Sequence, residues 1–322
     1  MYDKSFMKEL CEEAGILLET FSQGYVLRLS KKKVATPLCG GLGVAPPLSD
    51  GNCESNFLAK KVATPLCGGL GAAPPLSDGN CESNFLVNKK IRHILGSFWD
   101  INSAAADRIA CDKCACYTLL TANEIPAIQH QLLNNPVIRQ GWAKSTWAQA
   151  LEYFEKHNQK VVVKPNQGSG GIDVFYCDNI SCLEATIQKL FAIYPTVAIS
   201  PFYKITTEYR VFYLNGKCHY IYGKIATNTW KHNLSENAKV IEQNKIQNKE
   251  LLTKLQNMAS NAATTIGINF ASIDIAELST GELFIMEINS GVQARRLVEQ
   301  LPHLHDTIKN IYLSALTQMF EG

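Results

Sequence analysis

Basic, glycine and oxygen-bearing residues gather in three parts of this sequence, and their spacing indicates phosphate and metal chemistry. The first part is residues 164–171, which read KPNQGSGG. Glycines let a loop approach a phosphate and turn backbone N–H groups toward it, and Lys164 adds a positive charge. A strand-like run follows the glycines, whereas a P-loop or a dinucleotide fingerprint opens a helix. We therefore expect a flap between two strands, made by Gly168, Ser169, Gly170 and Gly171. An ordinary flexible hairpin has the same composition.

The second part is residues 270–289, FASIDIAELSTGELFIMEIN, which read as an antiparallel hairpin. With the turn at residues 280–281, Asp274 lies opposite Glu287, and Asn289 shares a face with Glu287 because strand side chains alternate. Like charges directly opposite each other are destabilising unless a cation neutralises them. Carboxylate and amide oxygens are ligands that Mg²⁺ prefers, so Asp274, Glu287 and Asn289 form a candidate metal site. The alternative is a solvent-exposed acidic face, or one acid held protonated.

The third group consists of the cations Lys113, Arg210 and Lys224, in the runs IACDK, EYRV and YGK. Taken singly, each of these residues is typical of a solvated surface. The histidines show no pairing that would suggest a nucleophile relay. The chemistry therefore depends on whether the fold brings these cations to the flap and the hairpin.

Periodicity predicts a mixture of helices and hairpins, which favours an α+β fold with mostly antiparallel sheets. Helices are expected over residues 4–14, 104–123, 146–157 (with Thr146 as N-cap), 181–193, 249–266 and 305–320. Strands are expected over residues 24–30, 90–98, 161–164, 172–177, 196–200, 208–214 and 217–224, besides those of the 270–289 hairpin.

A tandem repeat interrupts this pattern near the N-terminus. Residues 34–58 and 62–86 differ only at Val44 and Ala72, and each copy is rich in Gly, Pro, Ser and Asn. Such segments bury too little apolar surface to offset their ordering entropy. We expect residues 32–88 to be a mobile surface insertion between two paired strands. A recognition segment, a metal site and a peptide substrate are the alternatives for the repeat.

Composition narrows the class of protein. The chain has 322 residues, with 31 basic and 29 acidic side chains, and this balance argues against a dedicated nucleic-acid binder. No apolar run is long enough for a membrane span, and the first 15 residues lack the apolar core of a secretory signal. The 11 cysteines are therefore expected to be reduced thiols in a cytoplasmic protein. The Cys111, Cys114 and Cys116 cluster is expected to pack rather than to bind metal. A homo-oligomer is compatible with these features.

The order of the motifs resembles the ATP-grasp superfamily of carboxylate–amine ligases over residues 102–322. The run from Asn102 to Lys113 is similar to the ATP-grasp parts of cyanophycin synthetase and bifunctional glutathione synthetase. Residues 286–291, MEINSG, resemble those proteins and the ribosomal-protein glutamate ligases. The resemblance implies two α/β subdomains that grip ATP between antiparallel sheets. The expected domains are an N-terminal subdomain (1–101), an N-lobe with the flap (102–199) and a C-lobe with the metal site (200–322).

The resemblance also implies roles for the residues above, with ATP and Mg²⁺ (or Mn²⁺) as cofactors. Phosphates of ATP would be contacted by Lys113 and Lys164 under the flap, and the adenine hinge would be Ser200, Pro201, Phe202 and Tyr203. The metal would be held by Asp274, Glu287 and Asn289, while Arg210 and Lys224 stabilise the γ-phosphoryl group and an acyl phosphate. Pro201 stands where relatives often have Glu, and Ser290-Gly291-Val292 where many have Ser-Pro-Gly.

The implied reaction is ATP-dependent formation of an amide or peptide bond on an amino acid or peptide, through an acyl phosphate. The substrate is then a small molecule or peptide, with neither nucleic acid nor membrane as partner. One alternative is a non-catalytic ATP-binding or interaction protein with a degenerate substrate site. Another makes the repeats the substrate, with Asp50, Glu54, Asp78 and Glu82 joined to Ser, Thr or Lys side chains.

Overall fold

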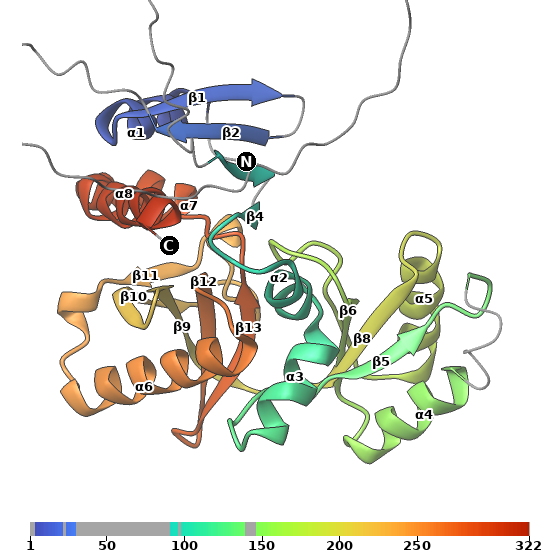
Figure 1. Cartoon of the computed structure of the whole chain (residues 1–322). Coiled ribbons are helices and arrows are strands. Elements are labelled where there is room, and N and C mark those ends of the chain that lie inside the picture. Colours follow the sequence, from blue (N-terminus) through green and yellow to red (C-terminus); the bar gives the residue numbers. More distant parts are fainter. Residues whose placement is uncertain (1–3, 22–23, 30–90, 96–97, 139–145, 322) are drawn as a thin grey trace, which may run out of the picture. The chain divides into compact units, whose positions relative to one another are not determined.

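The computed structural model describes residues 4–21, 24–29, 91–95, 98–138 and 146–321. The repeat, the insertion predicted over 32–88 and its candidate substrate acids lie outside these residues. Three antiparallel sheets and the helices around them make up the described part (Figure 1). The helices are α1 (Lys4–Glu13), α2 (Ala104–Cys111), α3 (Lys113–Ala122), α4 (Thr146–Lys156), α5 (Ile180–Phe191), α6 (Lys249–Ile266), α7 (Arg295–Gln300) and α8 (His305–Glu321).

The first sheet has the order β1-β2-β3-β4. Its strands are β1 (Ile16–Phe21), β2 (Gly24–Leu29), β3 (Ile91–Leu95) and β4 (Phe98–Trp99). Strands β2 and β3 pair in antiparallel register with Arg28 opposite Ile91, as the flanks of the repeat predict. Residues far apart in the sequence are therefore partners across one hairpin.

The second sheet has the order β5-β8-β6-β7 and carries the flap. Its strands are β5 (Gln131–Asn134), β6 (Val161–Pro165), β7 (Phe175–Cys177) and β8 (Thr196–Pro201). Helices α4 and α5 supply buried residues such as Phe154 and Leu183 to the core of this sheet. Strands β6 and β7 pair with Val161 opposite Cys177, so the glycine-rich segment joins two antiparallel strands as predicted.

The third sheet has the order β11-β10-β9-β12-β13 and carries the predicted catalytic cations and metal ligands. Its strands are β9 (Ile205–Leu214), β10 (Lys217–Ile225), β11 (Lys239–Ile241), β12 (Phe270–Leu278) and β13 (Leu283–Asn289). Helix α6 occupies the predicted range and buries Leu255, Ala259 and Ala263 against this sheet. Its small residues let the helix lie close to the strands.

The single helix predicted over residues 104–123 is wrong, because the chain breaks at Asp112 into α2 and α3. Asp112 has an extended conformation, and its side chain accepts a hydrogen bond from the Ala115 N–H at 2.9 Å as the N-cap of α3. Asn166, at the base of the flap, accepts from the Cys114 N–H at 3.2 Å. The tertiary contact thus satisfies N–H groups that a continuous helix would have paired internally. Both helices pack in the core of the third sheet through Ala106 and Leu120.

Three smaller expectations also differ from the structure. Thr146 is the first residue of α4, and its hydroxyl donates to the Asn134 carbonyl at 2.9 Å instead of capping the helix. Strand β7 begins at Phe175 rather than at residue 172, because Gly171 and Asp173 have positive φ angles. In the 270–289 hairpin, Glu277 faces Leu283 near the turn, one residue off the predicted register. A bulge between Ile275 and Asp274 restores the predicted pairing further from the turn.

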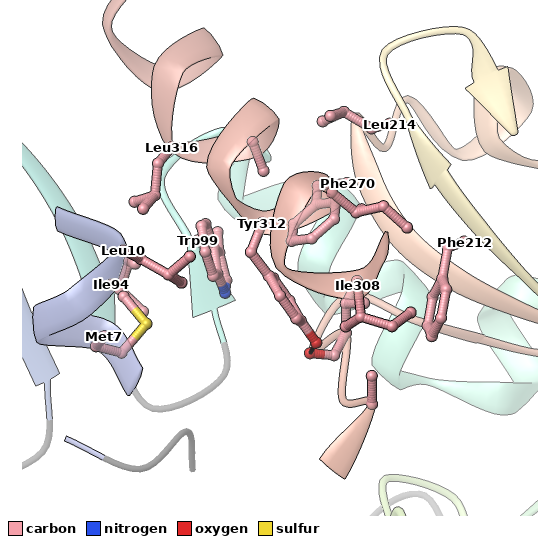
Figure 2. Packing of buried hydrophobic residues seen from close by; sticks show 14 of the residues in the cluster. Met7, Leu10, Ile94, Trp99, Phe212, Leu214, Phe270, Ile308, Tyr312 and Leu316 are labelled. Atoms are coloured by element: carbon pink, nitrogen blue, oxygen red, sulfur yellow. Dashed lines mark hydrogen bonds between the residues drawn. The ribbon is translucent and has the colours of Figure 1, made fainter. Parts of the chain in front are cut away.

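An aromatic cluster joins the N-terminal elements to the third sheet and α8 (Figure 2). Trp99 packs edge-on against Phe270, with ring centroids 5.1 Å apart, and stacks on Tyr312 at 6.0 Å. Met7 and Leu10 of α1 belong to the same buried cluster. Beside it, Lys309 of α8 pairs with Glu9 and Glu13 of α1. The ends of the described chain are therefore packed together.

Candidate active site

A row of charged side chains crosses one face of the third sheet. Register places Lys224 opposite Glu208, and Arg210 opposite Asp274, which in turn lies opposite Glu287. Because alternate residues of a strand share a face, the two-residue spacing of Glu208 and Arg210 puts both on the same side as their partners. The pairing of Asp274 with Glu287 predicted from the sequence is confirmed.

The acids of this row are neutralised by cations of the chain itself. Arg210 donates two hydrogen bonds to Asp274, at 2.7 and 2.6 Å, and Lys224 donates to Glu208 and lies 3.5 Å from Asp274. Burial opposes ionisation of Asp274, but the charges of Arg210 and Lys224 keep its pKa below the ordinary value. Burial raises the pKa of Glu208, although Lys224 opposes this effect. The four groups form one buried charge network, which holds the arginine and the lysine in place.

The predicted metal ligands lie together at one end of this network. The Asn289 side-chain amide donates to an Asp274 oxygen at 3.4 Å, and Lys113 Nζ lies 3.9 Å from a Glu287 oxygen. The half-buried Glu287 keeps an oxygen available on the cleft side, since Lys113 is its only ion-pair partner among the described residues. Two carboxylates and an amide in contact suit a hard divalent cation such as Mg²⁺.

The two predicted phosphate-binding lysines lie under the flap. Lys164 is the fourth residue of β6, and Lys113 is the first residue of α3; both are buried. Lys113 Nζ donates to the Gly168 carbonyl at 2.8 Å. Burial, and then the charge of Lys113, lower the pKa of Lys164 to about 8. Among the described residues no acid forms an ion pair with Lys164, and Glu287 is the ion-pair partner of Lys113, at 3.9 Å. The two lysines and one acid leave a net positive charge at this point, which suits an anion.

The flap itself depends on glycine at two positions. Gly170 and Gly171 both have a φ of +71°, a conformation that other residues adopt only with strain. A Cβ on Gly171 would lie 1.7 Å from Asn233 Nδ2, so the flap passes close to the loop before the short helix Leu234–Glu236. The flap base is tied down as well, because the Lys113 N–H donates to the Asn166 carbonyl at 3.3 Å.

A cleft of about 1000 Å³, its open mouth included, lies between the second and third sheets. All ten residues predicted to contact the nucleotide line it, namely Lys113, Lys164, Gly168, Ser169, Gly170, Gly171, Ser200, Pro201, Phe202 and Tyr203. Arg210, Asp274 and Glu287 line it too, whereas Lys224 and Asn289 line two neighbouring cavities. The cleft therefore runs from the hinge, past the lysines, to the charged row.

Sequence reasoning missed two sets of cleft residues. Glu208, which pairs with Lys224, has no role in the sequence prediction, although its two-residue spacing from Arg210 indicates that both share one face of the strand. Trp230 packs against Phe202 with ring centroids 5.7 Å apart, and Phe202 packs against Tyr176 at 4.6 Å. Trp230 belongs to an irregular segment with no periodic pattern, so only the folded chain reveals that it lines the hinge end of the cleft.

The antiparallel sheets, the glycine flap and the charged cleft between them define the ATP-grasp fold. The D-alanine–D-alanine ligase of Bacillus anthracis superposes with a TM-score of 0.52 at 17% identity, over 68% of this chain and 72% of its own. D-alanyl-alanine synthetase A of Vibrio cholerae O1 biovar eltor gives a TM-score of 0.54 at 16% identity, over 69% and 68%. At such identities the likeness shows the fold alone.

The sequence defines the family within this class. A model of the RimK-like ATP-grasp domain matches residues 110–303, so the chain belongs to the RimK-like ATP-grasp family. It is an ATP-dependent ligase of the kind that forms carbon–nitrogen bonds. No curated protein matches the chain by sequence. Within the described residues, no helix is both long and apolar enough to cross a bilayer.

Proposed function

We propose that the chain joins a carboxylate to an amine through an acyl phosphate, on an amino acid or peptide substrate. The observation that carries this proposal is the continuous line of groups from Lys164 and Lys113 to Arg210 and Lys224. Phosphoryl transfer requires mainly positioning and charge neutralisation, which these cations supply without a side-chain nucleophile. The names of the solved ligases with this fold support an amino-acid substrate class.

Each predicted residue has a role in this proposal. Lys113 and Lys164 hold the phosphates of ATP under the flap residues Gly168–Gly171, and the hinge residues Ser200, Pro201, Phe202 and Tyr203 hold the adenine. Arg210 and Lys224 neutralise the charge on the transferred phosphoryl group. The buried Glu208 and Asp274 orient these two cations through their hydrogen bonds.

Asp274, Glu287 and Asn289 suit Mg²⁺ or Mn²⁺ by the chemistry of their oxygens and by their mutual contact. Such an ion supplies charge neutralisation at the phosphates when it is bound. Arg210 and Lys224 would then share Asp274 with the ion, because Arg210 donates to Asp274 and Lys224 lies 3.5 Å from it.

The flap excludes water in this proposal. An acyl phosphate hydrolyses readily, so the site must close before the amine attacks. The exposed residues Gln167–Gly170 and the positive φ angles of Gly170 and Gly171 support a segment that closes over the cleft.

The test is ADP release from ATP and Mg²⁺ in the presence of pooled amino acids and short peptides. We expect substrate-stimulated release that Lys164→Ala and Glu287→Ala both abolish, with a product lighter than the sum of its parts by one water. Mg²⁺-dependent ATP binding without stimulated turnover in any pool would instead favour the non-catalytic binding protein. Absence of ATP binding would contradict the proposal at its first step.

A further inference from the structure

A separate cavity lies beside the reacting end of the cleft. It has a volume of about 810 Å³, its mouth included, between the flap, strands β9 and β10, the loop at Asn233 and helix α7. It shares Gly170, Arg210 and Asn233 with the nucleotide cleft but none of the hinge residues. A ligand in this cavity therefore reaches the phosphoryl end of the cleft, away from the adenine end.

The lining of this cavity is strongly basic. It contains the four cations Arg210, Lys224, Arg295 and Arg296, and no aspartate or glutamate occurs among the described residues that line it. The remaining polar groups include Tyr222, Asn233 and Gln293. Cations that line a cavity together, without acids on its surface, create a positive potential that favours an anionic ligand.

The four cations form two pairs with different surroundings. Arg210 and Lys224 are held from behind by Asp274 and Glu208, and the Lys224 side chain is only 3% exposed. The side chains of Arg295 and Arg296 are 82% and 68% exposed, and both pair with Glu299 one turn further along α7, at 2.8 and 3.3 Å. The first pair is held in place by buried acids and belongs to the proposed reaction site, whereas the second pair is exposed and would exchange its surface partner Glu299 for a ligand.

We propose that this cavity binds the carboxylate donor and that the donor carries a second negative group. Its reacting carboxylate lies at Arg210 and Lys224, and its second carboxylate is bound by Arg295 and Arg296. The guanidinium group suits this role because it binds a carboxylate through two parallel hydrogen bonds. This inference rests on the proposed ligase function and adds the substrate class to it.

The reaction sequence balances with ATP as the only activating reagent. A donor carboxylate oxygen bonds to the γ-phosphorus as the bond from that phosphorus to the bridging oxygen of ADP breaks. The amine nitrogen then bonds to the carbonyl carbon, loses a proton and displaces inorganic phosphate. The second carboxylate takes no part in either step, and it serves only to hold the donor in position.

Binding without turnover tests this inference directly. The full chain would be loaded with Mg²⁺ and a non-hydrolysable ATP analogue, and the binding of glutarate, L-glutamate, citrate and butyrate would be followed by ligand-observed NMR. We expect the multiply charged acids to bind at least tenfold more tightly than butyrate. Arg295→Gln with Arg296→Gln should remove this preference and leave butyrate unchanged. Equal binding of butyrate and glutarate, or no binding of any dicarboxylate, overturns the inference.

Two further variants separate ligand binding from a purely structural role of α7. Glu299→Gln releases both arginines, so it should tighten glutarate binding, whereas a role in helix stability alone predicts the same loss as the arginine changes. Lys254→Gln is the matched control, since Lys254 forms a similar exposed pair with Glu250 at 2.7 Å, on α6. It should leave all four affinities unchanged.

Failure of the inference and failure of the proposed function have different signatures. In one assay, ADP release is measured with hydroxylamine as the amine. Equal rates with butyrate and glutarate would support the ligase reaction but contradict the preference for a dicarboxylate donor. If the unmodified chain does not bind the ATP analogue, the proposed function itself is contradicted.

Discussion

Lys164 has a titration behaviour that follows from its position under the flap. Its side chain is buried beside a second lysine, and its pKa is lowered to about 8. A phosphate placed next to it would favour the charged form again. The proposed contact of Lys164 with a phosphate of ATP would therefore couple ATP binding to the protonation of Lys164.

We predict that ATP binding weakens as the pH rises above about 8, the pKa of Lys164 in the free protein. In that range Lys164 is neutral before binding and must take up a proton, so the Kd should rise by up to about tenfold per pH unit. Titration calorimetry between pH 7 and pH 9.5 measures the effect, and buffers of different ionisation enthalpy report the proton uptake. Lys164→Arg keeps its charge in this range and should show a flat profile. A matching slope in that variant would assign the titration to another group.

The same shift predicts how stability depends on pH. The pKa of Lys164 falls from 10.5 to about 8 on folding, so between these values the unfolded chain holds a proton that the folded chain has released. The free energy of unfolding should therefore rise with pH across this window, and Lys164 costs the folded state up to about 3 kcal/mol below it.

Lys164→Met should remove this cost and make the ligand-free protein more stable at pH 7, by up to about 3 kcal/mol. Urea unfolding at pH 7 and pH 9.5 measures it, with a smaller pH dependence expected for the variant. Parallel pH profiles for the two proteins would show that Lys164 keeps its ordinary pKa.

At the scale of elements, the flap is defined by its glycines and by its neighbour Asn233. Gly170 and Gly171 have the same φ of +71°, but only Gly171 has a neighbour where a Cβ would stand. The two positions therefore separate backbone strain from a steric clash within one loop.

We predict that Gly171→Ala lowers ATP affinity and turnover by more than Gly170→Ala does. Gly170→Ala carries only the left-handed strain of roughly 1–2 kcal/mol, while Gly171→Ala also pushes the flap away from Asn233. Asn233→Ala should partly restore the Gly171→Ala variant and leave Gly170→Ala unaffected. ATP binding and ADP release are measured on the two glycine variants, each with and without Asn233→Ala. Equal losses at both glycines, without rescue by Asn233→Ala, would mean that the contact with Asn233 is unimportant.

At the scale of the whole chain, the repeat region lies between two strands that pair directly with each other. Arg28 faces Ile91 across the β2–β3 ladder, so a short turn has the reach to connect these strands. The described residues that line the nucleotide cleft lie between Lys113 and Glu287. The described fold therefore does not depend on that segment for its pairing.

We predict that replacing residues 31–89 with a four-residue turn preserves folding and ATP binding. The shorter connection should even raise the stability by about 2 kcal/mol through the lower entropy of closing the loop. Thermal unfolding and ATP titration of the shortened chain check this. A large loss of ATP affinity would make the repeat region part of the binding site.

Local patterns in the sequence predicted much of the fold. Helix α6 occupies its predicted range because its apolar stripe follows the helical period over five turns. The pairing of Asp274 with Glu287 was also predictable, since a hairpin turn fixes the register of nearby strands to within a residue. The pattern failed between residues 104 and 123, where the cap from Asn166 comes from another part of the chain.

The candidate site, like the fold, was predictable from the sequence only in part. Residue types and spacing alone predicted the flap with Lys164 and the candidate metal ligands of the 270–289 hairpin, because each motif lies within about 20 residues of sequence, whereas the role of Lys113 came from the family resemblance. Only the folded chain showed that Arg210 pairs with Asp274, that Lys224 pairs with Glu208, and that Arg295 and Arg296 line one cavity with Arg210 and Lys224. These contacts depend on the order and register of strands that are distant in sequence, and side-chain periodicity carries no information about which strands become neighbours.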